Sequence, residues 1–100
     1  PINLGKGINT AGDELYPSIY NDYILHFASD GRPGFGGLDI FSSEINGDSF
    51  SAPKLLAAPI NSSGDDFGLI INSADTNQGF FTSNRYGGQG DDDIYRYKLK

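Results

Sequence analysis

The chain repeats itself after 52 to 54 residues, and this period limits what it can fold into. The segment Ile8–Glu14, INTAGDE, returns as Ile60–Asp66, INSSGDD, at an offset of 52. The longer segment Phe27–Phe41, FASDGRPGFGGLDIF, aligns without a gap on Phe81–Tyr95, FTSNRYGGQGDDDIY, at an offset of 54. A period of this length predicts stacked copies of one supersecondary unit rather than a single irregular core.

The first residues copy the end of the first repeat. Pro1–Asn9, PINLGKGIN, matches Pro53–Asn61, PKLLAAPIN, again at an offset of 52. The chain therefore divides into a closing strand at residues 1–7, a first repeat at residues 8–59 (repeat 1), and a second repeat at residues 60–100 (repeat 2), which supplies three strands.

Both repeats have the pattern of short strands and tight turns. Aromatic and β-branched runs alternate with Asn-Asp, Asp-Gly, Gly-Gly and Asn-Gly pairs, which favour turns. The expected strands are residues 1–5, 15–20, 23–29, 39–45, 51–58, 66–72, 79–83 and 93–99. We predict an all-β fold made of β-propeller blades, each with four antiparallel strands. The chain is expected to contain two blades, and its N-terminal strand is expected to complete a blade. Four aromatic residues recur in both repeats and are expected in the core: Phe27, Phe41, Phe81 and Tyr95.

Composition excludes several classes of function. The 100 residues are 37% apolar and 20% charged, as in an ordinary globular unit. A net charge of −6 without a basic cluster argues against nucleic-acid binding, and short apolar runs argue against membrane insertion or a signal peptide within these residues. The absence of cysteine excludes a disulfide scaffold. Because there is no methionine and the first residue is Pro1, we expect a segment of a longer protein.

The residues Gly12–Phe41, GDELYPSIYNDYILHFASDGRPGFGGLDIF, resemble the WD40-like propeller repeat of the TolB type. The blocks that carry the resemblance are Gly-Asp-Glu, Pro-Ser-Ile, Phe-Ala-Ser-Asp-Gly and Gly-Gly-x-Asp-Ile-Phe. The resemblance implies a propeller of the Gram-negative cell envelope, periplasmic or associated with the outer membrane, of the kind joined to tetratricopeptide or OmpA-type domains. Repeat 2 departs from the pattern at Gly68, Leu69, Ile70, Asn84 and Arg85.

The acidic residues concentrate in the loops that a blade would place on one face. Strands of a blade run alternately between the two faces of the disc, so the loop between the second and third strands and the loop between blades share a face. Nine of the thirteen acids fall there: Asp13, Glu14, Asp30, Asp39, Asp65, Asp66, Asp91, Asp92 and Asp93. Such a face is expected to attract cations or basic partner surfaces. The candidate residues for a protein partner are Asp30, Arg32, Phe35, Arg85 and Tyr86.

The segment Gly87–Tyr95, GGQGDDDIY, fits one copy of a calcium-binding nonapeptide. One copy supplies half a site, so calcium is left open as a ligand, with Asp91, Asp92 and Asp93 as the metal-binding candidates. The competing interpretation is that Asp39 and Asp93 accept backbone N–H bonds and close their own hairpins. The loop glycines Gly34, Gly36, Gly37, Gly87, Gly88 and Gly90 are expected to serve positive φ angles and tight packing.

No catalytic constellation is visible. His26 is alone on an apolar strand, and Ser29 and Ser83 have no neighbouring base in the sequence. We therefore expect no enzyme and no cofactor beyond the open case of calcium, and a binding or assembly module instead. The alternative is a fragment of a propeller hydrolase of the cell envelope, either carbohydrate-active or a peptidase.

The register of the ends predicts how the chain associates. Residues 1–5 supply the strand that repeat 2 lacks, so a neighbouring chain is expected to provide it. We expect a head-to-tail homo-oligomeric ring, with a trimer favoured. The alternative partners are further blades of a longer chain.

Overall fold

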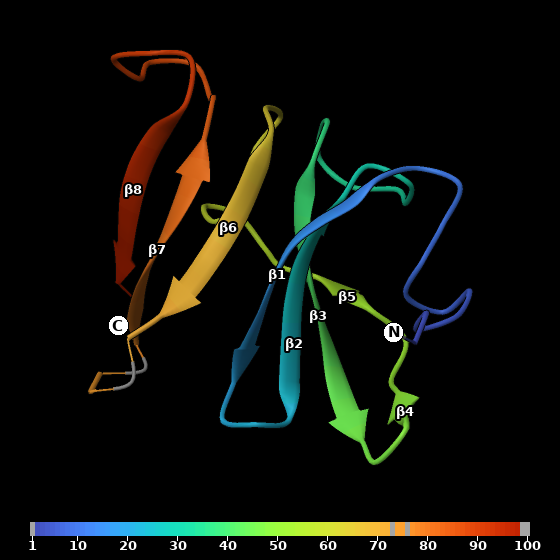
Figure 1. Cartoon of the computed structure of the whole chain (residues 1–100). Helices are drawn as coiled ribbons and strands as arrows, with labels where there is room; N and C mark the ends of the chain where they lie inside the picture. Colours follow the sequence, from blue (N-terminus) through green and yellow to red (C-terminus); the bar gives the residue numbers. More distant parts are fainter. Residues whose placement is uncertain (1, 73, 76, 99–100) are drawn as a thin grey trace.

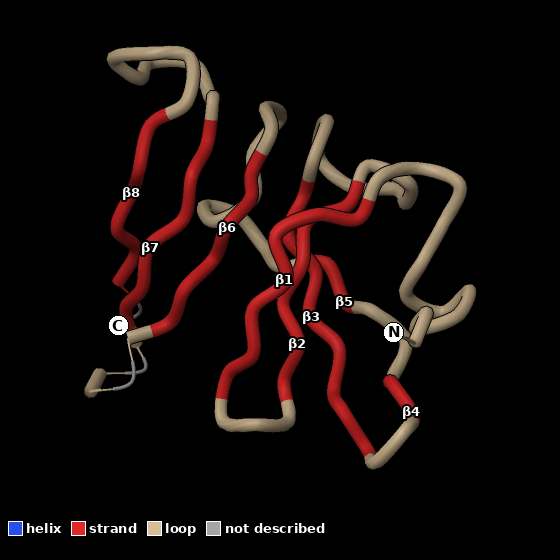
Figure 2. The backbone as a smooth tube through the Cα atoms, viewed as in Figure 1, coloured by secondary structure: helices blue, strands red, loops and turns tan. Residues whose placement is uncertain are grey.

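Two antiparallel sheets, one from each repeat, make up the computed structural model (Figure 1). The structure describes residues 2–72, 74–75 and 77–98. Across these residues the chain consists of strands and loops (Figure 2), so the prediction of an all-β fold with antiparallel strands is confirmed. Within the same ranges, no helix is long and apolar enough to cross a membrane.

The first sheet belongs to repeat 1 and the second sheet to repeat 2. The strands of the first sheet are β1 (Glu14–Tyr20), β2 (Ile24–Ser29), β3 (Asp39–Asn46), β4 (Ser49–Phe50) and β5 (Lys54–Leu55). The strands of the second sheet are β6 (Asp66–Ile71), β7 (Gln78–Ser83) and β8 (Asp93–Lys98). In each sheet the first three strands lie in chain order, and β5 pairs with the outer edge of β3.

Six of the expected strands agree with the structure to within one residue at each end, but the strands expected at residues 1–5 and 51–58 do not. The strand expected at residues 51–58 shortens to Lys54–Leu55, and the Asn46–Ser49 turn adds the small strand β4. Residues 2–5 form no strand, because a strand needs a hydrogen-bonding partner and none of the described strands pairs with them. The expected strand ends at Pro1 and Leu99 lie outside the described residues.

A β-bulge occurs at the same place in both repeats. The pairing of β1 with β2 shifts between Leu15 and Ser18, and the pairing of β6 with β7 shifts 52 residues later. The first bulged residue has a positive φ in each case, 54° at Tyr16 and 71° at Gly68. Glycine adopts this conformation freely whereas tyrosine rarely does. The Tyr16 ring stacks on Phe67 with centroids 4.7 Å apart, which couples the strained residue to the second sheet.

Two apolar clusters form the core. The first consists of Ile8, Leu25, Phe27 and Phe41 from repeat 1 and its entry loop. The second joins the sheets, because Ile40 of the first sheet packs with side chains of the second sheet, namely Leu69, Phe81 and Tyr97. The burial expected for Phe27, Phe41 and Phe81 is confirmed, and Tyr95 is half-buried with its ring stacked on Phe81 at 5.8 Å.

The polar part of the contact between the sheets centres on Asn61, which is 1% exposed. The Ile40 N–H donates to Asn61 Oδ1 at 2.7 Å, and Asn61 Nδ2 donates to the carbonyl oxygens of Ile40 at 2.9 Å and Leu56 at 2.7 Å. Two further bonds cross nearby, from the Asp66 N–H to Leu38 O at 2.7 Å and from the Leu38 N–H to Asp65 Oδ1 at 2.8 Å. The loop entering repeat 2 is therefore bonded to β3 of repeat 1.

Replacing Asn61 with alanine is expected to lower the free energy of unfolding by about 1 to 3 kcal/mol, because it leaves the buried N–H of Ile40 without a partner. Chemical denaturation in dilute solution measures the change. The matched control is Asn9→Ala, since Asn9 occupies the equivalent position in repeat 1 but its side chain, within the described residues, bonds only to the exposed Asn3 Oδ1. Its expected cost is below about 0.5 kcal/mol. Equal losses in the two variants would contradict the role given to Asn61.

Candidate binding site at the acidic end of the sheets

The acidic loops of both repeats lie at one end of the two sheets. Figure 1 shows residues 9–13, 30–38, 61–65 and 84–92 at the top of the view, whereas the turn between β1 and β2 and the turn between β3 and β4 lie at the bottom. We call the end formed by those four loops the acidic end. It collects the loop segments that the sequence pattern assigned to one face.

In repeat 2 a buried carboxylate organises this end. Asp66 is fully buried and accepts hydrogen bonds from the Ser62 N–H and from Ser83 Oγ, both at 2.7 Å. Arg85 Nη2 donates to Asp66 Oδ1 at 3.1 Å. The Arg85 guanidinium also donates to the carbonyl of Pro59, and it lies over the rings of Phe81 and Tyr95 at 5.0 and 5.2 Å. The network ties the entry loop of repeat 2 to its hairpin.

Repeat 1 contains the same network with Glu14 as its centre. Glu14 accepts bonds from the Thr10 N–H at 2.9 Å, from Thr10 Oγ1 at 2.6 Å and from Ser29 Oγ at 2.7 Å. Arg32 Nη1 lies 3.7 Å from Glu14 Oε2, and Arg32 Nη2 donates to the carbonyl of Gly7. Burial raises the pKa of Glu14, but the bonds from Thr10 and Ser29 and the charge of Arg32 together bring it below its ordinary value.

The two arginines therefore act inside the protein. The side chain of Arg32 is only 15% exposed and that of Arg85 only 21% exposed. Both residues were candidates for a partner surface. The serines that lacked a neighbouring base in the sequence, Ser29 and Ser83, donate to Glu14 and Asp66 respectively. The spacing of Thr10 to Glu14, repeated by Ser62 to Asp66, was the available signal for this network.

Asp30 and Asn84 perform one task in the two repeats. The Asp13 N–H donates to Asp30 Oδ1 at 2.8 Å, and the Asp65 N–H donates to Asn84 Oδ1 at 2.7 Å. The exchange of aspartate for asparagine thus preserves the bond, because both side chains present an acceptor oxygen. Asp30 remains exposed, so its second carboxylate oxygen can face a partner.

The interpretation of Asp39 and Asp93 as residues that close their hairpins is confirmed. Asp39 Oδ2 accepts bonds from the N–H groups of Phe35 at 2.9 Å and Gly36 at 3.2 Å. Asp93 Oδ2 accepts the equivalent bonds from Gln89 at 2.7 Å and Gly90 at 3.1 Å. Asp39 Oδ1 is buried with no hydrogen-bond partner among the described residues, and burial raises the pKa of this carboxyl.

Close packing accounts for most of the loop glycines. Of the six glycines expected to need a positive φ, only Gly87 has one, at 95°. A Cβ atom on Gly34 or Gly88 would lie 2.1 or 2.2 Å from the carboxylate that closes the hairpin, and a Cβ on Gly36 would lie 2.0 Å from Ser63 O. The expected positive φ was wrong for the other five positions, whereas the expected tight packing is confirmed at Gly34, Gly36 and Gly88.

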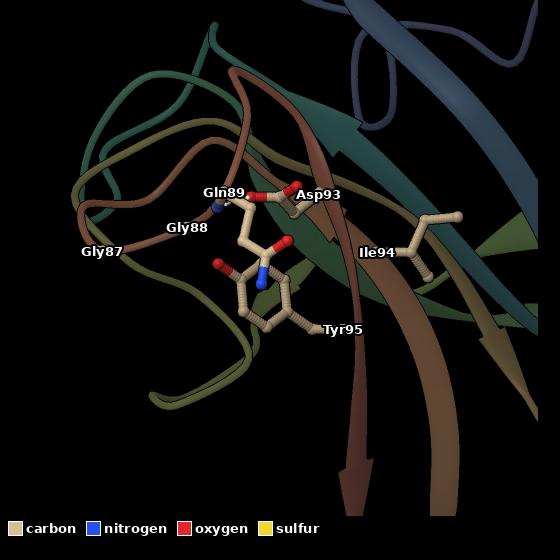
Figure 3. Close-up of a pocket in the computed structure, with 6 residues that line it drawn as sticks. All are labelled: Gly87, Gly88, Gln89, Asp93, Ile94 and Tyr95. Carbon is tan, nitrogen blue, oxygen red and sulfur yellow. Dashed lines mark hydrogen bonds between the residues drawn. The ribbon is translucent and has the colours of Figure 1, made fainter.

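The exposed groups of the acidic end are carboxylates and aromatic rings. Asp13, Asp91 and Asp92 are exposed, and Phe35 and Tyr86 project with exposed fractions of 49% and 104%. An open cavity of about 370 Å³ lies beside the Gly87–Gln89 turn. Figure 3 shows its lining, with the Asp93 carboxylate against that turn and the Tyr95 ring below.

A calcium site at Asp91, Asp92 and Asp93 stays a prediction. In the part of the chain that the structure describes, no group of three or more histidine, cysteine or acidic side chains is arranged to hold a metal ion. Asp93 already accepts two backbone bonds through one oxygen, which leaves Asp91 and Asp92 as the exposed carboxylates of the segment. His26 lies in β2 and is 6% exposed, and burial lowers its pKa.

Comparisons of the chain with protein-family models, with curated proteins and with solved structures found no match. The TolB-type resemblance therefore stands on the sequence blocks alone. Function must be argued from the geometry of the acidic end.

Replacing Glu14 with glutamine is expected to lower the free energy of unfolding by about 1 to 2 kcal/mol at neutral pH, because the bonds to an ionised acceptor become neutral. Since folding lowers the pKa of Glu14 below 4.5, its contribution is present above that pH and is lost as the pH falls through the lowered value. The stability difference between the original chain and the variant should shrink below about pH 4.5. Thermal melting between neutral and acidic pH measures it.

The matched control for this prediction is Glu44→Gln, which changes an exposed glutamate on β3 in the same way. Its effect should stay within about 0.5 kcal/mol at every pH. A Glu14→Gln variant that behaves like this control would show that the network contributes nothing to stability.

Proposed function

We propose that the chain is a non-enzymatic β-propeller module that binds basic protein surfaces through its acidic end. The observation that carries the proposal is the separation of charge within the loops. Both arginines of these loops point into the repeats and bond there, whereas Asp13, Asp30, Asp91 and Asp92 are exposed. The exposed charge of the loops is therefore carried by carboxylates.

Electrostatics gives such a surface a defined preference. The chain carries a net charge of −6, and an end lined by charges of one sign raises the local concentration of cationic partners and speeds their association. The exposed aromatic rings of Phe35 and Tyr86 add apolar contact area at the same end. Aromatic anchors surrounded by charged residues are a common arrangement in protein interfaces.

The bonding of the carboxylates supports binding rather than hydrolysis. A glycoside hydrolase needs two carboxyl groups that face a substrate with different protonation. Here Asp39 and Asp66 are buried, and Asp93 is committed to its turn. These residues recur at equivalent positions in the two repeats, as structural groups do. A periplasmic or outer-membrane location belongs to the proposal through the resemblance of Gly12–Phe41 to the TolB-type repeat.

A labelled peptide of roughly eight lysines is the probe for this proposal, with binding followed by fluorescence anisotropy at low and at physiological salt. The variant Asp91→Asn/Asp92→Asn should bind the peptide several-fold more weakly, because it removes two exposed charges from the acidic end. The affinity of the unmodified chain should fall as salt increases.

The control variant removes the same number of charges at the opposite end of the sheets. Asp22→Asn/Asp48→Asn alters exposed aspartates in the turns after β1 and β3. The proposal requires this variant to bind the peptide nearly as well as the unmodified chain. If binding weakened equally in the two variants, the effect would depend on net charge alone, and a specific role for the acidic end would be overturned.

A further inference from the structure

The surface that joins the two repeats has an unused counterpart on each outer face of the chain. We propose that a second copy of this chain docks head to tail, with Ile94 of one copy entering an apolar pocket on repeat 1 of the next. Asn9 of the second copy then bonds to the backbone of Ile94. This inference goes beyond the proposed function and does not rest on it.

The projecting half of the contact is the outward face of the second sheet. Ile40 in β3 is 1% exposed because repeat 2 covers it, whereas its equivalent Ile94 in β8, 54 residues later, is 77% exposed. A position two residues along β2 from the partner of Ile40 shows the same contrast, since His26 is 6% exposed and its equivalent Phe80 is 46% exposed. Repeat 2 thus presents to solvent the apolar face that repeat 1 buries.

The receiving half is a pocket of about 160 Å³ on the opposite side of the chain. Ile40 shares an apolar cluster with seven residues of the following segment, four of which are Leu56, Ile60, Leu69 and Phe81. The equivalents of these four in repeat 1 and its entry loop line the pocket: Leu4, Ile8, Pro17 and Phe27. The pocket therefore contains part of the site that corresponds to the one filled by Ile40 between the repeats.

Asn9 is the counterpart of Asn61 and is placed to make the same kind of bonds to the next copy. Asn61 bonds to both the N–H and the C=O of Ile40. The turn that presents Asn61 is closed by a bond from its N–H to Ala57 O at 3.3 Å, and the equivalent bond, from the Asn9 N–H to Gly5 O at 2.8 Å, closes the turn before Asn9. Asn9 Nδ2 bonds to Asn3 Oδ1, so its side chain can exchange that exposed bond for the backbone of Ile94.

The open strand edge fits the same arrangement. β5 pairs with the outer edge of β3 through Phe41 opposite Leu55 and Ser42 opposite Lys54. The repeat offsets transfer this register to Tyr95 opposite Asn3 and Arg96 opposite Ile2 of the next copy. Within the described residues no strand covers the outer edge of β8, and residues 2–5 form none. Docking pairs the outer edge of β8 in one copy with residues 2–5 of the next copy.

The complementary halves lie on one chain, and this points to a second copy as the occupant. Each copy carries both the projecting Ile94 and the receiving pocket, on opposite faces. Such a contact is heterologous, so it extends from copy to copy until it closes into a ring or continues as an open assembly. The contact already seen between repeats 1 and 2 supplies the geometry.

Paired cysteines test the register, since the chain has no cysteine of its own. Ile2→Cys/Arg96→Cys should form disulfides between chains on mild oxidation, giving reducible multiples of 10.8 kDa on a denaturing gel. Ser42→Cys/Lys54→Cys is the matched control, because these residues are partners within one chain and should lose their thiols without a change in mass. A mismatched pair, Ile2→Cys/Lys98→Cys, measures random collision.

The proposal is overturned if the interchain pair stays at one-chain mass while the control pair closes, or if it links no more than the mismatched pair. Sedimentation supplies a second readout that needs no cysteine. The unmodified chain should sediment as a multiple of 10.8 kDa, and Ile94→Asp should weaken the association by about 30-fold or more, the loss typical of a central interface residue.

Ile94→Asp should remain folded by circular dichroism, because Ile94 is exposed in the single chain. Tyr23→Asp, in the exposed turn after β1, is the control and should leave the association unchanged. A well-folded unmodified chain that stays at 10.8 kDa at every concentration overturns the proposal and assigns these surfaces to another occupant, such as a further repeat.

Discussion

The arrangement of the two sheets depends on how the backbone of Ile40 is satisfied where the repeats meet. An N–H and a C=O buried beside an apolar side chain must be hydrogen-bonded, because leaving either unpaired costs about 1 to 3 kcal/mol. Asn61 bonds to both groups of Ile40 with one amide, and the Leu56 N–H adds a second donor to the carbonyl. Once the backbone is satisfied, the Ile40 side chain can pack against Leu69 and Phe81. The hydrogen bonds of Asn61 and the apolar cluster around Ile40 therefore act together at the contact between the sheets.

A second set of hydrogen bonds fixes the loops at the acidic end. Each entry loop is held to its own hairpin by a carboxylate, two hydroxyl side chains and an arginine that lies over two aromatic rings. Because these groups hold one another within the repeat, the loops of the acidic end keep a defined shape while other carboxylates face the solvent. The arginine bonds also explain why a loop region with two cationic residues still presents an acidic surface.

The sequence could predict what depends on local pattern. Strand positions follow from alternation and turn residues, and the hairpin-closing role of Asp93 follows from its place just before an apolar strand. The role of Asn61 could not be predicted, because its partner is the backbone of Ile40, 21 residues away. Almost every residue has the same backbone N–H and C=O groups, so the sequence does not indicate which residue is bound. The bonds that the arginines make within the repeats could not be predicted for another reason. Arg32 follows Ser29 by three residues and Arg85 follows Ser83 by two, so a gapless alignment separates side chains that occupy the same place.

The proposed assembly and the proposed binding surface meet at one pair of residues. Between the repeats, the Leu38 N–H donates to Asp65 Oδ1. The repeat offsets give Asp92 and Asp13 as the equivalent pair across two docked copies, so docking brings the exposed loops that contain Asp92 and Asp13 into contact. A basic partner that bridges these two loops would bind the assembled form more tightly than the single chain. By linkage the same partner would then strengthen the association of the copies by the same factor. Docking of further copies and binding of the basic partner would therefore favour each other.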